Sequence, residues 1–444
     1  MTGSVLDGRP PDQACSAHPP PAHMTGAPSR RVLFVILRLP RPMISVRGLV
    51  AGHEAMSGTH STSLLVADGL ARRGWDVGML ILSGGRLTET SVVTFDDLAQ
   101  AHSWLGNNRA VWCYHGDAGI MEMLRKASIH PVVWSHIDLS SEVSDWLDRD
   151  WITGVVTVSD FCRLALLHHS KHRRIGRIYN PLNPFYAGDN ETQPIEREHP
   201  RQAVFSGYVG ETKGAHHMFR CWRHVRRALP DAQLVVAGSA KLYRDDASLG
   251  PHGVASPEFE KRHIDPLVQE FGSLEQAGVR LVGLLSPAEL RSLYRRSSLG
   301  VINLNPYNAT ETFSCSGVEM AACGLRVFSM ASAALPETVG FTGNAVLVTR
   351  PAQLVPAFVD ALSKPKDLKS MDAQQQQVRD RYRLSRILDH WEELLVAPAD
   401  RFYDLAGPWQ YNRNFRYVVK RMLARIHAGR LLDRFLELRT RLRK

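Results

Sequence analysis

Two stretches of the sequence share one order of elements, and this repetition limits the possible folds more than any other feature. In the first, the apolar segment Arg31–Leu37 is followed by a loop, a helical pattern that ends at Gly74, and a second apolar segment, Val77–Leu82. The second stretch runs in the same order from Ala203–Gly207 to Gln233–Gly238. A strand, a crossover helix and a second strand are typical of parallel sheets. We therefore expect two doubly wound α/β domains that face each other, with a ligand between them.

Changes in composition divide the chain into five parts. Residues 1–30 are rich in Pro, Gly, Ala and Ser without apolar periodicity, which predicts disorder. A polar stretch from residue 186 to residue 200 is the best candidate for a linker. The predicted parts are a disordered segment at 1–30, an N-terminal domain at 31–187, a C-terminal domain at 201–370, helices that pack back across both domains at 371–411, and a basic helical tail at 412–444.

The overall composition is that of a globular protein. Of the 444 residues, 44% are hydrophobic and 22% are charged. No apolar run approaches the roughly 18 residues that cross a bilayer, and no secretory signal is visible. The six cysteines are scattered rather than paired in metal-binding or disulfide patterns, which favours a reduced, cytoplasmic protein.

The net charge of +10 is concentrated at the C-terminal end of the sequence. Residues 412–444 contain eleven Lys or Arg and only two acidic residues, Asp433 and Glu437. Apolar residues recur there at helical spacing, which predicts an amphipathic basic helix that binds anionic lipid on the cytoplasmic face of a membrane. Two alternatives are open: the apolar stripes pack on the body of the protein, or the tail binds nucleic acid. The latter is not expected, because no nucleic-acid module accompanies the tail.

The stretch Glu311–Glu319 carries the clearest functional signal. It lies between the apolar segments Leu299–Leu304 and Leu325–Met330, so that Glu311 follows a strand and Glu319 lies in the first turns of a helix. The small residues between the two glutamates leave helix N-terminal amides open to an anion. Such a site can hold a phosphate while two carboxylates accept hydrogen bonds from hydroxyls. A nucleotide sugar has this distribution of polar groups.

Several short motifs follow one another along residues 31 to 365. They are Ser57-Gly58, Leu70–Gly74, Val155–Ser159, Ile178–Pro181, Gly207–Gly214, Val279–Gly283, Glu311–Glu319, Ala322–Gly324 and Leu335–Glu337. Together these motifs resemble the retaining glycosyltransferases of the GT-B fold in the family called glycosyl transferases group 1.

The resemblance implies a role for each residue of the donor site. Glu319 binds the ribose hydroxyls, Glu311 binds the hydroxyls of the donor sugar, and Gly58 lets the backbone approach the phosphate. Backbone amides of Phe313, Ser314, Cys315 and Ser316 hold the sugar or the distal phosphate.

A lysine in the glycine-rich loop is expected at the diphosphate. Lys213 is a compact positive charge beside a helix N-terminus, which suits a departing diphosphate. In the family an arginine usually follows the first glycine of this loop. Tyr208 stands there in this chain, and a tyrosine can hydrogen-bond a phosphate but cannot neutralise it.

Two histidines compete for one place in the cleft. His136 follows the apolar segment Val132–Ser135, and His115 follows Ala110–Tyr114. The resemblance implies one histidine beside the donor sugar. We take His136, with His115 as the alternative.

The resemblance also implies a mechanism in which the leaving phosphate accepts the proton of the acceptor. Lys213 and helix amides then stabilise the negative charge. No metal-ligand cluster and no Asp-x-Asp motif is visible near the site, so we predict transfer without a metal or another cofactor.

The predicted substrates are a nucleotide-sugar donor and a glycan or lipid-linked acceptor, used in envelope or exopolysaccharide assembly. Two other functions remain open. One is a catalytically silent GT-B protein that binds a nucleotide sugar or a partner, which Tyr208 favours. The other is an epimerase of the same fold, for which the sequence shows no acid–base pair.

Overall fold

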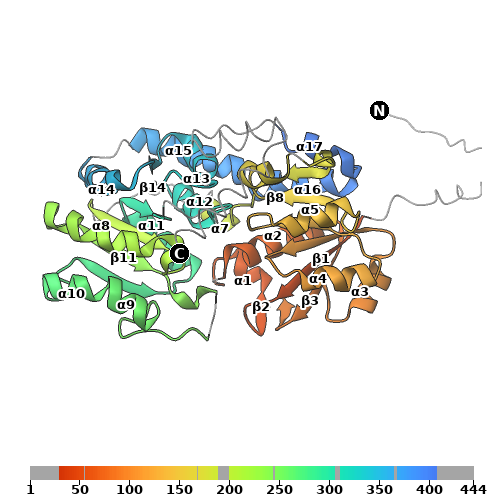
Figure 1. The fold of residues 1–444 in the computed structure, drawn as a ribbon, viewed down its shortest axis with the longest axis horizontal. Helices are drawn as coiled ribbons and strands as arrows, with labels where there is room; N and C mark the ends of the chain where they lie inside the picture. Colours follow the sequence, from red (N-terminus) through yellow and green to blue (C-terminus); the bar gives the residue numbers. More distant parts are fainter. Residues whose placement is uncertain are drawn as a thin grey trace, which may run out of the picture.

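The computed structural model contains two α/β domains that lie side by side (Figure 1). It describes residues 30–54, 56–167, 169–188, 200–243, 246–305, 311–364 and 368–407. The predicted disordered segment at 1–30, apart from residue 30, most of the predicted linker and the basic tail at 412–444 therefore lie outside the described residues. Among the described residues, no helix is long and apolar enough to cross a membrane.

The first domain is built on a seven-stranded parallel sheet in the order β5-β3-β1-β6-β7-β8-β9. Its strand β1 (Arg31–Arg38) lies between β3 and β6 and has a run of five buried residues, as expected for a strand covered on both faces. The other strands are β3 (Asp76–Ser83), β5 (Val93–Phe95), β6 (Arg109–Tyr114), β7 (Val132–Ser135), β8 (Gly154–Thr157) and β9 (Ile175–Arg177). The helices of this domain are α1 (Val46–Val50), α2 (Gly58–Arg72), α3 (Leu98–Leu105), α4 (Gly119–Lys126), α5 (Ser141–Asp148), α6 (Asp160–Arg163) and α7 (Pro184–Ala187).

The second domain repeats this architecture with a six-stranded parallel sheet in the order β12-β11-β10-β13-β14-β15. The strands are β10 (Gln202–Ser206), β11 (Gln233–Ala237), β12 (Val279–Gly283), β13 (Leu299–Val301), β14 (Arg326–Met330) and β15 (Val346–Val348). Its helices are α8 (Ala215–Ala228), α9 (Pro257–His263), α10 (Asp265–Phe271), α11 (Pro287–Arg296), α12 (Cys315–Ala322), α13 (Leu335–Thr338) and α14 (Leu354–Ser363). Two short 3-10 turns, η3 (Glu211–Lys213) and η4 (Ala240–Leu242), follow β10 and β11. The predicted α/β class with two parallel sheets is confirmed.

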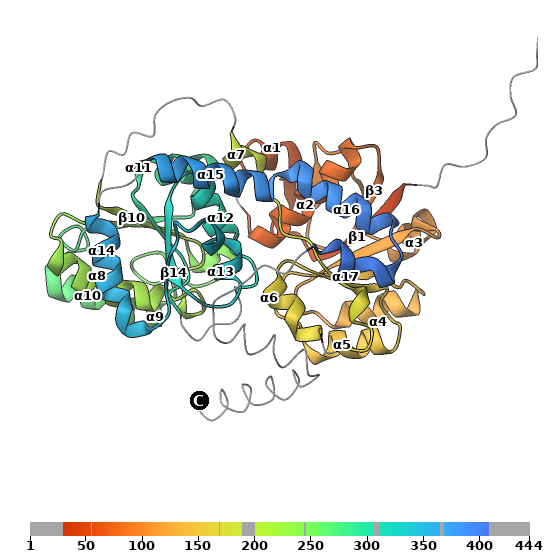
Figure 2. The same ribbon diagram turned by 90° about the horizontal axis from the view of Figure 1, so that it is seen from above.

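The last described helices cross from the second domain to the first (Figure 2). They are α15 (Leu368–Tyr382), α16 (Leu384–Val396) and α17 (Phe402–Leu405). The side chains of Gln375 and Arg379 on α15 donate to the carbonyl of Ala322 at the end of α12, at 2.8 and 3.1 Å. α16 then packs along α2, where Arg73 donates to Asp389 and Glu392 at 2.7 Å each.

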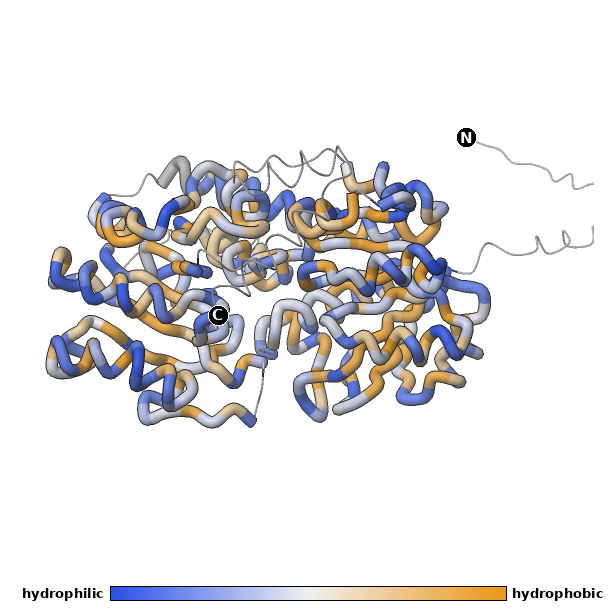
Figure 3. The backbone as a smooth tube through the Cα atoms, viewed as in Figure 1, coloured by the Kyte–Doolittle hydropathy of each residue, from blue (hydrophilic) through white to orange (hydrophobic). Residues whose placement is uncertain are grey.

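Apolar residues gather on the strands of both sheets (Figure 3). One cluster of buried side chains contains residues of both domains, including Phe34 of the first sheet and Val204 of the second. Trp391 of α16 joins this cluster, with its ring 4.6 Å from Trp134 and 6.1 Å from Phe34. The two domains and the crossing helices therefore share a continuous core.

The structure differs from the sequence-based prediction in a few short elements. The segment between β1 and Met56 is not a plain loop, because it contains β2 (Met43–Ser45), which pairs with β4 (Arg86–Thr88), and α1. The three-residue strands β5, β9 and β15 at the sheet edges were not predicted. Segments this short are too brief to show a recognisable alternation of apolar residues.

Candidate active site between the two domains

Lys213 and Glu311 form an ion pair. The Lys213 Nζ lies 2.6 Å from the Glu311 Oε2, and Asn303 Nδ2 donates to the same oxygen at 3.3 Å. The Lys213 side chain is 26% exposed and that of Glu311 is 7% exposed. Burial alone would lower the pKa of Lys213, but the adjacent carboxylate outweighs it and raises the pKa above its ordinary value. The Glu311 carboxylate therefore keeps Lys213 in its charged form.

A glycine brings Lys213 to this position. Gly214 has φ of 70° and ends the 3-10 turn η3, and a Cβ there would lie 2.3 Å from the backbone nitrogen of Asn305. Only glycine fits such a left-handed turn so close to another backbone. The loop after β10 is thereby pressed against the segment after β13.

The helix α12 begins at the predicted donor-binding residues. Ser314 is its N-cap, and the Ser314 hydroxyl accepts a hydrogen bond from the Gly317 N–H at 3.3 Å. Cys315 and Ser316 form the first turn. The side chain of Phe313 is buried and packs against Tyr382, with 5.3 Å between ring centres. The Phe313 side chain is therefore part of the core, and only the Phe313 backbone is available to a ligand.

Glu319 lies one turn further along α12, on the same face as Cys315. The Glu319 side chain is half-buried and lines a hollow between the domains, together with Gly58, Pro181 and Asn183. Burial raises the pKa of Glu319 to about 7. No hydrogen bond joins the Glu319 carboxylate to another described residue, so it is available to accept hydroxyls from a ligand.

Gly58 is the first residue of α2 and faces the second domain. A Cβ on Gly58 would lie 2.7 Å from the Cys315 Sγ and 3.0 Å from the Cys315 Cβ. The start of α2 and the start of α12 therefore meet in direct contact. The missing side chain leaves room for the Cys315 side chain, and the approach of the Gly58 backbone to a phosphate stays a prediction.

Three histidine rings form a row on the first domain. The ring centres of His60 and His115 are 5.5 Å apart, and those of His115 and His136 are 5.8 Å apart. His136 is 7% exposed, and neither of its ring nitrogens has a hydrogen-bond partner. Burial, with the nearby His115 and His60, keeps the pKa of His136 well below its ordinary value. His136 is therefore neutral, and its two ring nitrogens are buried without a hydrogen-bond partner.

The other two histidines are held by the protein. His60 shares hydrogen bonds with Ser57 Oγ at 2.7 Å and with the Arg38 carbonyl at 2.8 Å. His115 is exposed, and its Nδ1 lies 2.8 Å from the Cys113 carbonyl. The backbone carbonyl of His136 accepts a hydrogen bond of 2.6 Å from Thr312 Oγ1 of the second domain. His136 therefore lies against the loop of Glu311, and His115 lies one ring further away.

Tyr208 lies on the glycine-rich loop between β10 and η3. Its ring folds over Gly210, where a Cβ would lie 2.2 Å from the Tyr208 Cε1. The ring centre is 5.5 Å from that of Tyr243, which follows η4. Of the predicted site residues, Lys213 and Glu311 are therefore paired on the second domain, and Tyr208 stacks on Tyr243 there. The hollow between the domains is lined by Gly58, Phe313, Cys315 and Glu319.

Glu337 was not assigned a role from sequence, yet it joins the two domains. Its carboxylate accepts the backbone N–H groups of Asp160 at 2.7 Å and Phe161 at 3.0 Å, at the start of α6. The Tyr179 hydroxyl donates to the same carboxylate at 2.9 Å. Burial and the nearby Asp160 raise the pKa of Glu337 to about 7, while Arg177 opposes them. The sequence signals were the Leu335–Glu337 motif and the small N-cap residue Ser159, but nothing local shows that they meet.

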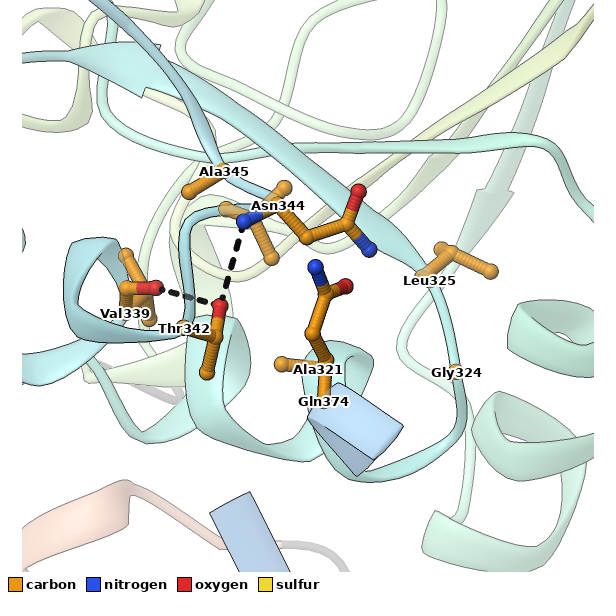
Figure 4. Close-up of a pocket in the computed structure, with 9 residues that line it drawn as sticks. Ala321, Gly324, Leu325, Val339, Thr342, Asn344, Ala345 and Gln374 are labelled. Carbon is orange, nitrogen blue, oxygen red and sulfur yellow. Dashed lines mark hydrogen bonds between the residues drawn. The ribbon is translucent and has the colours of Figure 1, made fainter. Parts of the chain in front are cut away.

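A second hollow lies on the other side of α12 (Figure 4). It is lined by residues of α12, β14 and the turn after α13, including Ala321, Leu325 and Thr342. Thr342 Oγ1 donates to the Val339 carbonyl at 3.4 Å and accepts from the Asn344 N–H at 3.4 Å. This hollow has no ionisable lining residue and lies apart from the Lys213–Glu311 pair, so we do not assign it to the site.

Within the described ranges, His, Cys, Asp and Glu side chains form no cluster of three or more that could hold a metal ion. Transfer without a metal stays a prediction.

Comparison with known proteins supports the resemblance seen in the motifs. Residues 189–378 match the family model of glycosyl transferases group 1. No curated protein matches the sequence.

Solved structures match over most of the chain. HepE from Anabaena, in complex with UDP and glucose, has a TM-score of 0.59 at 15% identity, and the match covers 82% of this chain and 99% of HepE. A glycosyltransferase from Rickettsia africae has a TM-score of 0.61 at 15% identity, with 82% and 97% covered. WaaG, a glycosyltransferase involved in lipopolysaccharide biosynthesis, has a TM-score of 0.56 at 12% identity, with 82% and 100% covered. The chain therefore has the GT-B fold, and its second half matches the family of glycosyl transferases group 1.

Proposed function

We propose that this protein is a glycosyltransferase that moves a sugar from a nucleotide-sugar donor to a hydroxyl acceptor. The observation that carries the proposal is the buried pair of Lys213 and Glu311 beside the start of α12, at 2.6 Å. A lysine, helix N-terminal amides and two carboxylates offer a binding group to each part of a nucleotide sugar. The family match of residues 189–378 and the UDP and glucose bound to HepE support the same donor class.

The ion pair suggests how a donor enters. In the free protein, Glu311 neutralises Lys213. A diphosphate competes for the ammonium, and the released carboxylate becomes free to accept hydroxyls of the donor sugar. When the donor binds, Lys213 exchanges Glu311 for the diphosphate, and Glu311 exchanges Lys213 for sugar hydroxyls. No charge is therefore buried without a partner. The Lys213 charge then stabilises the transition state most strongly, because negative charge develops on the diphosphate as it leaves.

We also propose that transfer retains the anomeric configuration. The leaving phosphate takes the proton of the acceptor hydroxyl on the same face of the sugar, while Lys213 and the amides at Ser314–Ser316 stabilise its charge. His136, neutral and with both ring nitrogens free, lies beside the donor sugar. Proton NMR of the first product distinguishes the outcomes: a product with the anomeric configuration of the donor supports retention, and the opposite configuration contradicts it.

The acceptor that we propose is a glycan or a lipid-linked glycan of envelope or exopolysaccharide assembly. The involvement of the structural neighbour WaaG in lipopolysaccharide biosynthesis supports this class of pathway. We place the protein in the cytoplasm, bound peripherally to the membrane through residues 412–444, whose eleven basic residues suit anionic lipid. Removal of these residues should abolish co-sedimentation with anionic vesicles while donor binding persists. Vesicle binding that survives the truncation would contradict the proposal.

The experiment that tests the function starts with the purified full chain and a panel of nucleotide sugars. A thermal-shift screen should find at least one nucleotide sugar that raises the melting temperature. That ligand should then be hydrolysed slowly without acceptor. The Glu319→Gln variant is the control, since it should lose most of the thermal shift. The absence of a shift with every donor would contradict the proposed function.

A second function is a GT-B protein that binds a nucleotide sugar without turning it over. Tyr208 favours it, because this residue stands where the family usually has an arginine. Binding without hydrolysis or transfer, over hours and with enzyme near the donor concentration, would support this second function over the first.

A further inference from the structure

Two tyrosines on neighbouring loops stack on each other, and one of them, Tyr208, lies on the loop that carries Lys213. Tyr208 follows β10 and Tyr243 follows β11, and these strands are adjacent and parallel in the second sheet. The loops are pressed together, since a Cβ on Gly238 would lie 1.8 Å from the Gly207 carbonyl oxygen. The two rings lie 5.5 Å apart and are tilted by 35°. The packing of these loops thus fixes the pair in place.

Tyr208 and Tyr243 are placed differently in this pair. The Tyr208 ring folds over Gly210 and stacks on Tyr243. Tyr243 is 58% exposed overall, so much of its ring reaches solvent. Burial of the rest of the side chain raises the pKa of its phenol, Lys213 lowers it, and Glu311 raises it again. The phenol is therefore neutral and can donate its O–H.

The charge balance shows what the site lacks. Lys213 and Glu311 together carry no net charge, while the diphosphate of a nucleotide sugar carries about two negative charges. Tyr208, on the same loop as Lys213, adds no charge. A further donor beside Lys213 and the amides at Ser314–Ser316 would stabilise the bound diphosphate, because a phosphate oxygen that loses water without a replacement partner lowers affinity.

We propose that Tyr243 is a phosphate-binding residue whose hydroxyl donates to the diphosphate of the donor, and that Tyr208 positions the Tyr243 ring by stacking. The proposal rests on the proposed function and deepens it. No hydrogen bond joins the Tyr243 hydroxyl to another described residue, so the group is available for this contact.

The test compares single-atom variants of the full chain in calorimetric titrations with UDP, GDP and ADP, and with the matching nucleosides. For the best diphosphate, Tyr243→Phe should weaken binding about tenfold or more, because a hydrogen bond to a charged group is lost. The nucleoside should bind to this variant as it binds to the wild type. Tyr403→Phe on α17 of the crossing helices is the matched control and should leave both affinities unchanged.

Variants of Tyr208 separate positioning from direct contact. Tyr208→Phe keeps the ring and should bind the diphosphate nearly as the wild type does, whereas Tyr208→Ala should approach the weak binding of Tyr243→Phe. Equal diphosphate affinity of the wild type and Tyr243→Phe would overturn this proposal and leave the proposed function untouched. The same holds if Tyr243→Phe loses nucleoside affinity and diphosphate affinity equally, or if Tyr208→Phe loses diphosphate affinity tenfold. A wild-type protein that binds no nucleoside diphosphate would overturn both this proposal and the proposed function.

Discussion

At the scale of single residues, the Lys213–Glu311 pair is the part of the site that depends most on mutual support. The two charged groups lie 2.6 Å apart, and the carboxylate is almost fully buried. Removing one partner leaves the other charged and unpaired, which is more damaging than removing both.

Lys213→Ala should therefore lower both stability and activity. We expect the free energy of unfolding to fall by about 1–3 kcal/mol, because the Glu311 carboxylate loses its partner. In the double variant Lys213→Ala/Glu311→Gln, most of this loss should be recovered, as measured by urea denaturation. If the function is as proposed, Lys213→Ala should lower kcat more than it raises KM. A change confined to KM would contradict the role of this lysine at the leaving phosphate.

Glu319 predicts a dependence on pH. Its pKa is raised to about 7 in the folded protein, whereas an unfolded glutamate titrates near pH 4.3. Between these two pH values Glu319 is ionised in the unfolded chain but still protonated in the folded protein. Glu319 therefore lowers the free energy of unfolding more and more as the pH rises from about 4.3 to about 7, and by a constant amount above pH 7. Glu319→Gln lacks the group and should melt at a higher temperature than the wild type at pH 8. The difference should shrink as the pH falls towards 4.3, and a constant difference would contradict the shift.

The same titration should affect the donor. A carboxylate accepts two ribose hydroxyls, whereas a protonated carboxyl is a poorer acceptor. Donor affinity of the wild type should therefore fall as the pH drops through 7. Glu319→Gln should bind the donor about tenfold or more weakly at pH 8, with little dependence on pH. If Glu319→Gln binds the donor as tightly as the wild type in calorimetry, the proposed role of Glu319 in donor binding is wrong.

The residues of the candidate site could be proposed from the sequence where their chemistry is local, and their roles stay predictions. Lys213 and Glu311 could be named because a glycine-rich loop and a strand-to-helix loop each follow an apolar strand. Their direct pairing could not be predicted, since it joins residues 98 positions apart. Glu337 was missed as a link for the same reason: its partners lie on α6 of the other domain.

At the scale of elements, the starts of α2 and α12 are in contact because Gly58 has no side chain to keep them apart. A Cβ on Gly58 would lie 2.7 Å from the Cys315 Sγ, which real structures do not allow without movement. The two helices belong to different domains, so this contact sets how closely the domains approach at the site.

Gly58→Ala should therefore push the helices apart. We expect it to weaken donor binding and to lower the melting temperature, because the interface must shift to admit a methyl group. The double variant Gly58→Ala/Cys315→Gly should recover much of both losses. Gly119→Ala is the matched control: Gly119 also begins a helix, and its Cβ would meet only the Asp117 side chain, at 3.2 Å. Equal effects of the two single substitutions would contradict the role of the contact.

The elements that the sequence predicted best are those buried on both faces of a sheet. β7 was predicted with its observed bounds, Val132–Ser135, and β1 to within one residue. The edge strands β5, β9 and β15 were missed because each has three residues and one neighbour, so that pairing rather than composition defines them.

At the scale of the whole molecule, the crossing helices join the two halves. α16 covers α2, where a Cβ on Gly69 would lie 2.7 Å from the Leu388 side chain, and the Phe402 ring packs on Gly154. Arg109 donates to the carbonyls of Leu394 and Ala397, at 2.6 and 3.0 Å. The first domain is therefore completed by residues from the far end of the sequence.

Two truncations test this arrangement. A chain that ends at Gly407 keeps the crossing helices and should unfold as cooperatively as the full chain. A chain that ends at Arg383 lacks α16 and α17, exposes the apolar face of α2 and the Trp134 ring, and should aggregate or melt at a much lower temperature. Circular dichroism melts and size-exclusion chromatography would measure both effects. Similar melting of the two truncated chains would show that the crossing helices add little to the first domain.

The crossing helices also have a consequence for the order of events during biosynthesis. The last strand of the first sheet ends at Arg177, but α16, which covers this domain, begins at Leu384. At about 5–20 residues per second, a ribosome needs about 10–40 s to make the chain between these points. Throughout that interval the nascent first domain presents an uncovered apolar helix face to the cell. It is therefore the emerging protein, rather than the finished one, that should depend on a chaperone.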